Sequence, residues 1–303
     1  MKVSLKYTAC LLVAIALAGC HKKELCTDEE LGNAPTLLKV DWLGTSPTAP
    51  TMQLHVWGVA ETVAVDTLFS MASDATVRLN LPEAEYAVVA THAASHVRFD
   101  GECFFLETGA DGLLSEPDEF SAGSGTFHAV AQQENTYVLP LLPFTRRLAL
   151  RFSLDREADG RIASISARLG GIASARRLAD RTTTLGEAGA VSMAIERESS
   201  SGTRAGNDAG GDDIFFSGSR NLLGIHTNER QLLTLTLRYT NSEEETLEQD
   251  LTSYLKDFND HASGPMEDVT LNAGITLAGQ PGVSATISDW KRGTDSDQDA
   301  TDK

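Results

Sequence analysis

The sequence is poor in basic residues, and this shortage excludes one class of partner. Lysine and arginine together number 25, against 43 aspartate and glutamate residues, so the formal net charge is −18 at pH 7 over 303 residues. Nucleic acids are bound largely through clusters of lysine and arginine, and a strongly acidic surface repels their phosphates. We therefore expect no nucleic-acid partner. With 41% apolar and 22% charged residues, the composition is otherwise that of a globular protein.

The sequence also lacks a long apolar run. The run from Ala9 to Ala18 has ten residues, whereas a helix needs about 20 to cross a bilayer. It follows Lys2 and Lys6 and precedes Leu-Ala-Gly-Cys ending at Cys20, which is the order of a secretory signal. Leu-Ala-Gly-Cys resembles the bacterial lipobox. This resemblance implies cleavage before Cys20 and acylation of its thiol and new amino terminus; an ordinary cleaved signal is the alternative.

Lipidation would attach the mature chain to a membrane. Each buried methylene of an acyl chain contributes about 0.8 kcal/mol, and two or more chains give stable anchoring. We expect residues 1–19 to be a lipoprotein signal peptide and residues 20–34 a lipidated linker. Since no later apolar run approaches spanning length, we expect the rest of the chain to lie outside the bilayer, at the outer membrane and on the cell surface.

Cysteine is scarce, with four in the whole chain. Cys10 would leave with the signal peptide and Cys20 would carry lipid, which leaves Cys26 and Cys103 as thiols. In an exported protein they are compatible with one disulfide. It would close a loop of 103 − 26 = 77 residues and contribute about 4 to 5 kcal/mol in the chain-entropy treatment. Because Cys103 lies in an expected strand, a small buried thiol fits it equally well.

The dominant pattern of the mature chain is alternation of apolar and polar residues, interrupted by Gly, Pro, Asn and Asp. Apolar residues alternate at 38–42, 75–81 and 148–154, and similar short runs recur to residue 290. This period of two indicates half-buried strands, and many short strands with frequent turns indicate an antiparallel β-sandwich. One short helix is expected at Thr252–Phe258, where apolar residues have helical spacing.

The expected all-β chain divides into two domains. Pro140 and Pro143 bracket two leucines and would interrupt a central strand, and the alternation restarts beyond Phe144. We expect an N-terminal β-sandwich at 35–143, a C-terminal β-sandwich at 144–292 and a disordered tail at 293–303.

The sequence offers little for catalysis or metal binding. His92 and His96 are four residues apart but lack the glutamate of the zinc-protease motif, and they fall in a strand or turn. No Gly-x-Ser-x-Gly motif occurs, and no nucleophile and base stand in a recognisable set. We expect no enzymatic activity, no catalytic residues, no metal site and no cofactor.

Tryptophan is the residue most suited to a glycan. The sequence has three, and Trp42 and Trp290 lie at the ends of alternating strands, where core or rim positions are expected. Trp57 lies on the same strand face as Gln53 and His55 and is the better exposed of the three. It is the residue expected to stack on a sugar, should the protein bind one.

Several motifs in chain order resemble one family. They are the lipobox, Leu25-Cys26-Thr27-Asp28, a strand ending at Asp41-Trp42, Leu81-Pro82-x-x-x-Tyr86 with Val88-Val89-Ala90, Leu169-Gly170-Gly171, Asp250-Leu251-Thr252 and Ile287-Ser288-Asp289-Trp290. The chain resembles the fimbrial anchor and accessory lipoproteins of the Bacteroidales, the FimB-like members of the fimbrillin-like superfamily. The resemblance spans most of residues 20–292. It implies two transthyretin-like β-sandwich domains in tandem.

The resemblance implies a structural role. We expect a lipid-anchored fimbrial anchor or accessory subunit that contacts fimbrial subunits or other surface proteins and holds a partner by β-strand addition. In the family's shaft subunits, cleavage after a basic residue releases an early strand. Here Arg146-Arg147 and Arg176-Arg177 lie at or beyond the expected boundary, so we expect no such maturation. The alternative is a glycan-binding outer-membrane lipoprotein of a nutrient-capture system.

Overall fold

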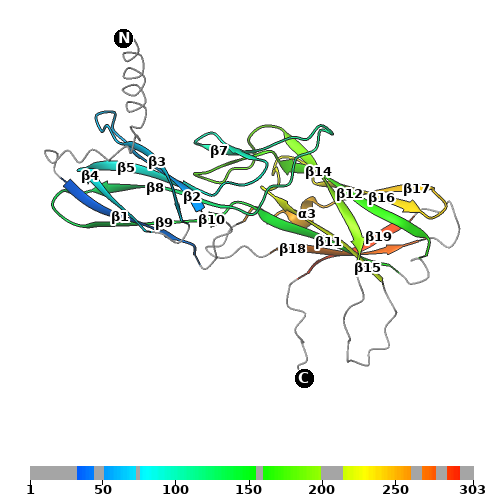
Figure 1. Cartoon of the computed structure of the whole chain (residues 1–303). Coiled ribbons are helices and arrows are strands. Elements are labelled where there is room, and N and C mark those ends of the chain that lie inside the picture. Colours follow the sequence, from blue (N-terminus) through cyan, green and yellow to red (C-terminus); the bar gives the residue numbers. More distant parts are fainter. Residues whose placement is uncertain are drawn as a thin grey trace, which may run out of the picture.

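The computed structural model is almost entirely β-sheet (Figure 1). It describes residues 33–43, 51–72, 76–154, 160–198, 214–260, 268–277 and 285–293. The strands of the first half are β1 (Asn33–Asp41), β2 (Thr51–Gly58), β3 (Asp66–Ala72), β4 (Val77–Pro82), β5 (Ala84–Thr91), β6 (Val97–Phe99), β7 (Cys103–Leu106), β8 (Ser121–Ala129), β9 (Asn135–Pro140) and β10 (Leu142–Pro143).

The second half continues the pattern. Its elements are β11 (Arg146–Leu154), β12 (Ile162–Ala173), β13 (Ala175–Arg177), β14 (Ala188–Arg197), β15 (Ile214–Leu222), β16 (Leu232–Tyr239), β17 (Glu244–Asp250), α3 (Thr252–Leu255), β18 (Val269–Thr276) and β19 (Thr286–Gly293). The expected helix is therefore confirmed but shorter, since turns follow Leu255.

The first domain is built from two sheets. One has the order β4-β1-β9, and the other has the order β10-β8-β5-β2-β3. Strand β1 lies between two partners, antiparallel to β4 and parallel to β9. It begins at Asn33, slightly before the expected start of the domain at residue 35, and Ala34 is already fully buried.

The second domain has an eight-stranded sheet with the order β17-β16-β12-β14-β15-β11-β18-β19. Here β11 lies between its partners as β1 does, antiparallel to β15 and parallel to β18. The link between β14 and β15 is short, with only the pairs Glu196–Ser217 and Arg197–Phe216 in register. The sheet is therefore two four-stranded parts that join at one corner.

The two domains share one strand topology. Seven strands of each domain correspond in order: β1, β2, β3, β4, β5, β8 and β9 in the first domain, and β11, β12, β14, β15, β16, β17 and β18 in the second. In both sets the first strand pairs with the fourth and the seventh, the second strand pairs with the third and the fifth, and the fifth strand pairs with the sixth. The expected all-β fold with tandem sandwiches is confirmed.

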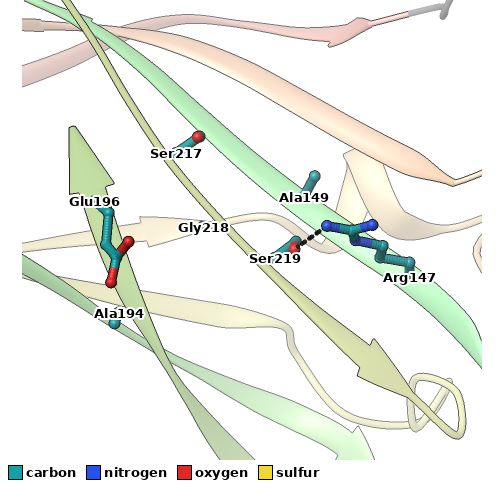
Figure 2. A pocket seen from close by; sticks show the side chains of 7 residues that line it. All are labelled: Arg147, Ala149, Ala194, Glu196, Ser217, Gly218 and Ser219. Atoms are coloured by element: carbon teal, nitrogen blue, oxygen red, sulfur yellow. Dashed lines mark hydrogen bonds between the residues drawn. The ribbon is translucent and has the colours of Figure 1, made fainter. Parts of the chain in front are cut away.

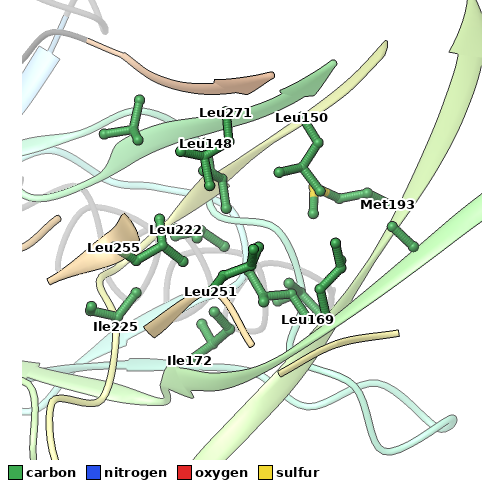
Figure 3. Packing of buried hydrophobic residues seen from close by; sticks show 14 of the residues in the cluster. Leu148, Leu150, Leu169, Ile172, Met193, Leu222, Ile225, Leu251, Leu255 and Leu271 are labelled. Atoms are coloured by element: carbon green, nitrogen blue, oxygen red, sulfur yellow. The ribbon is translucent and has the colours of Figure 1, made fainter. Parts of the chain in front are cut away.

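Two clusters of apolar side chains form the interior. The cluster of the first domain contains Leu54, Val56, Tyr86 and Leu139. The larger cluster follows the alternation of β11, whose residues Leu148, Leu150, Phe152 and Leu154 are all at most 1% exposed. Figure 3 shows leucine and isoleucine side chains of this cluster meeting from several strands.

The larger cluster also draws on the first half of the chain. Phe104, Phe120 and Phe144 are buried in it, and the Phe104 ring centroid lies 4.9 Å and 4.8 Å from those of the other two. Strand β7 pairs with β13 of the second half, so the β6–β7 hairpin bridges the domains. We keep residue 143 as the proposed boundary of the chain's two domains, with this hairpin packed across it.

Candidate functional site

The expected sugar-stacking residue lies on the face of the five-stranded sheet that points away from the first-domain core, where it packs against the larger apolar cluster. Trp57 is half-buried on β2, and its ring centroid lies 4.6 Å from that of His55 with 36° between the planes. The His55 Nε2 atom lies 2.6 Å from Asp66 Oδ1 on the neighbouring strand β3. Leu68, opposite His55 in register, is 63% exposed. Together His55, Trp57, Asp66 and Leu68 form what we call the β2–β3 platform.

The β2–β3 platform has the chemistry of a sugar-binding surface. Aromatic faces pack against the apolar faces of pyranose rings, while a carboxylate and an imidazole can hydrogen-bond to hydroxyl groups. Sequence reasoning singled out Trp57 but missed Asp66, because the cross-strand neighbour of a residue is set by register. A role for Trp57 in stacking stays a prediction.

The other two tryptophans lie at structural positions. Trp290 is 8% exposed and meets Phe152 edge to face, with a centroid distance of 5.7 Å. Trp42 stacks on His92 at 4.9 Å with an interplanar angle of 16°. His92 is itself 4% exposed, and burial lowers the pKa of its imidazole. Trp290 is therefore less available to a ligand than Trp57, whereas Trp42 is half-buried like Trp57.

The expected lipid attachment and disulfide involve cysteines that lie mostly outside the described residues. Both Cys20, the expected lipid site, and Cys26 lie outside them. Cys103 is buried on β7 at 8% exposure, and burial is the main cause that raises the pKa of its thiol. The Cys26–Cys103 pairing therefore stays a prediction.

A shallow cavity opens on the outer face of the second domain (Figure 2). Its volume is about 360 Å³, and it is lined by Arg147, Ala149, Ala194, Glu196, Ser217, Gly218 and Ser219. Arg147 donates a hydrogen bond from Nη2 to Ser219 Oγ at 2.7 Å. Its floor is made of the small residues Ala149, Ala194 and Gly218, with Arg147 and Glu196 on opposite sides.

The arginine pairs of the sequence are held by the fold. Arg176 is 1% exposed and donates from Nη1 to the carbonyl oxygens of Phe144 and Leu223, each at 2.9 Å. Burial and the neighbouring Arg181 lower its pKa to about 9. Arg146 donates to the carbonyl oxygen of Phe258 at 2.8 Å. Sequence patterns alone did not indicate that an arginine would be buried at the domain junction.

The described residues contain no group of three or more His, Cys, Asp and Glu side chains arranged to hold a metal ion. Nor does any helix among them have the length and apolar character required to span a bilayer.

Comparison with known proteins shows which fold this is. No protein-family model matches the chain, and no curated protein matches it either. Among solved structures, the fimbrial anchor protein Mfa2 from Porphyromonas gingivalis is similar with a TM-score of 0.56 and 11% identity, over 85% of this chain and 97% of that one. A proposed adhesin from Bacteroides ovatus has a TM-score of 0.57 and 9% identity, over 78% of this chain and 89% of that one.

A third solved structure carries a different description. It is a proposed polysaccharide-binding protein from Bacteroides thetaiotaomicron, with a TM-score of 0.50 and 10% identity, over 86% of this chain and 99% of that one. At these identities the likeness concerns the fold. The resemblance to fimbrial anchor proteins of the Bacteroidales, indicated by the sequence motifs, is thus confirmed at the level of the fold.

Proposed function

We propose that the protein is a lipid-anchored surface protein that acts as a fimbrial anchor or accessory subunit and holds a partner by β-strand addition. The observation that carries this proposal is the shared fold with Mfa2, which covers 97% of that fimbrial anchor protein. The mature protein would be attached to the outer membrane through Cys20 and exposed at the cell surface. No catalytic step is part of this role.

The position of β1 supports an anchoring role. From Cys20 to the first residue of β1 is 33 − 20 = 13 residues, which span at most about 45 Å when fully extended. Strand β1 is paired along both edges, with β4 and with β9. A pull on the lipid would therefore act on a central strand, whose hydrogen bonds to both neighbours resist it together.

We expect β1 to be retained in the mature protein, which would separate it from a cleaved shaft subunit. In the two arginine pairs considered as protease sites, Arg176 is buried, and Arg146 donates a hydrogen bond to the carbonyl oxygen of Phe258 in the turn that follows α3. Both pairs lie beyond β9, so cleavage there would not free β1 alone. Fibres that contain this protein without its first strand would contradict the proposal.

Substitution of the lipid site tests the anchor role. In cells that assemble the fibres, Cys20→Ala should move the protein out of the membrane fraction and release fibres into the medium. Cys26→Ala is the matched control and should leave both in place. Fibres that stay attached to cells carrying Cys20→Ala would overturn the proposal.

Glycan binding is a second candidate function. It is favoured by the β2–β3 platform, in which Trp57 and His55 present adjoining rings beside Asp66. Affinity electrophoresis against host and plant polysaccharides would test it. Retardation that is lost in Trp57→Ala and kept in His128→Ala, an exposed residue of β8, would support the platform; no retardation by any glycan would reject it.

A further inference from the structure

The shared topology of the domains reveals which sheet edges are left open. In the second domain, β14 and β15 pair at one corner, and β18 carries the additional strand β19. The equivalent strands of the first domain are β3, β4 and β9. Within the described residues, each of these three has a strand partner on one side only.

Charge distinguishes β9 from the other edges. Natural edge strands are commonly protected by charged residues, which disfavour pairing with another chain. Among the described strands that end a sheet, β3, β4, β6, β13, β17 and β19 each contain at least one charged residue. Strand β10 has only two residues. Strand β9, Asn-Thr-Tyr-Val-Leu-Pro, is uncharged along its six residues.

The side chains of β9 also suit an added strand. Leu139 is 2% exposed and Tyr137 half-buried, so these two face the core, while Thr136 and Val138 point outward. Val138 is 48% exposed in the middle of the strand. Strand β9 pairs with β1 in continuous parallel register from Asn135 to Pro140. Strand β9 is therefore paired with β1 along one edge, and its outward face carries the uncharged residues Thr136 and Val138.

In the second domain, the edge of β18 that corresponds to the open edge of β9 is covered by an additional strand. Strand β19 pairs antiparallel with β18, from Thr276–Thr286 to Thr270–Gly293. It places Trp290 against Phe152 at the edge of the core, where the indole is 8% exposed. The amide of Ala285, just before β19, donates to Glu245 Oε1 of β17 at 2.6 Å. An eighth strand thus closes the side of the sandwich.

We propose that the free edge of β9 accepts an extended segment of a partner surface protein. The segment pairs antiparallel with β9, as β19 pairs with β18, and presents alternating apolar side chains toward the first domain. Main-chain hydrogen bonds supply affinity, and the alternating side chains supply specificity. This rests on the strand addition of the proposed function and adds its location; β1 stays in place.

Photo-crosslinking in fibre-assembling cells tests the location. A benzophenone amino acid replaces Thr136 or Val138 in the full-length protein, and Leu68 on β3 or Leu232 on β16 in the controls. We expect adducts from positions 136 and 138 on one partner segment, at residues two apart and in reversed order. Adducts on unrelated segments, adducts in parallel order, no adducts, or the same segment captured from Leu68 would overturn the proposal.

A pair of substitutions provides a second readout. Val138→Asp places a charge on the edge and should reduce partner association at least tenfold in pull-down titrations, whereas the β-branched Val138→Thr should retain it. Thermal unfolding of both variants shows whether they remain folded. If Val138→Asp leaves association unchanged while Cys20→Ala still releases fibres, the edge assignment fails and the anchor role stands.

Discussion

In the first domain strand β9 ends its sheet, whereas in the second domain the equivalent strand β18 is covered by β19. The same difference appears at the opposite corner, where β14 pairs with β15, whereas the described residues of their counterparts β3 and β4 do not pair with each other. The second domain also shares its core with the β6–β7 hairpin of the first half. Within the described residues, the same topology thus gives one continuous sheet that ends at β17 and β19 in the second domain, and two separate sheets that end at β4, β9, β10 and β3 in the first. Four predictions test this contrast, in order of decreasing effect.

The largest effect is expected where the second domain depends on the first half of the chain. Phe104→Ala should lower the free energy of unfolding of the second domain by about 3–5 kcal/mol, because a buried aromatic ring is removed from the shared cluster. With Trp42 and Trp57 replaced by Phe, the fluorescence of Trp290 reports that domain in denaturant titrations.

The control for this prediction lies in the first-domain core. Leu54→Ala should lower the free energy of unfolding of the first domain by about 2–5 kcal/mol. It should leave the unfolding of the second domain, followed by Trp290 fluorescence, unchanged. A Trp290 transition that does not respond to Phe104→Ala would show that the second domain closes without the hairpin.

A smaller loss of stability is expected from a substitution at the corner where β14 pairs with β15. A Cβ atom on Gly218 would lie 2.4 Å from the carbonyl oxygen of Ala194 and 2.7 Å from Ile195 Cδ1. Gly218→Ala should therefore force the strands apart and cost about 1–3 kcal/mol in denaturant unfolding. Gly160→Ala meets nothing within 4 Å and is the matched control. Equal stability of the two variants would mean that this corner is not tightly closed.

The ion pair between Arg151 and Glu198 at the same corner should contribute less to the free energy of unfolding. Arg151 on β11 donates to both carboxylate oxygens of Glu198, at 2.8 Å and 3.0 Å, and its guanidinium lies 3.9 Å from the Phe215 ring centroid. Because the pair is partly exposed, Glu198→Gln should cost about 0.2–1 kcal/mol, and the loss should vanish in 1 M salt. Glu196→Gln is the control; an effect independent of salt would point to packing instead.

The smallest effect concerns the end of β17. The hydroxyl and amide of Thr252 and the guanidinium of Arg230 donate to Asp250 and lower its pKa from 3.8 to about 2. A lowered carboxyl pKa stabilises the folded state above pH 3.8, and this contribution disappears as the pH falls toward 2. Asp250→Asn should flatten that part of the thermal midpoint profile, whereas Asp260→Asn should follow the wild type. Parallel wild-type and Asp250→Asn profiles would refute this.

The strands were predictable because each depends on a short stretch of sequence. Alternation at 148–154 correctly indicated β11, and its apolar residues are buried as that pattern predicts. The turn between β6 and β7 likewise depends on adjacent residues, because Gly101, which follows Asp100, has a φ of +103°. Trp57 was expected to be the best exposed of the three tryptophans; it is half-buried where Trp290 is buried, but Trp42 is half-buried as well.

Other features depend on residues far apart in the chain. The burial of Arg176 follows from β13 pairing with β7, more than 70 residues earlier, and an arginine pair in sequence suggests a surface. Asp66 joins His55 and Trp57 only through the register of β2 with β3. Local patterns do not contain this information, because alternation indicates which face of a strand is buried but not which strand lies beside it.

Sequence alone determined that this chain is acidic and built of short amphipathic strands, and its motifs indicated a resemblance to fimbrial anchor proteins. Those properties depend on composition, on the period of two and on turn residues. Tertiary structure decided which of the described strands end a sheet, that β19 pairs with β18, and that among the described strands β9 pairs with β1 alone. The reason is physical: an edge is a strand whose hydrogen-bonding groups lack a neighbour, and the neighbour is chosen by the packing of the whole chain.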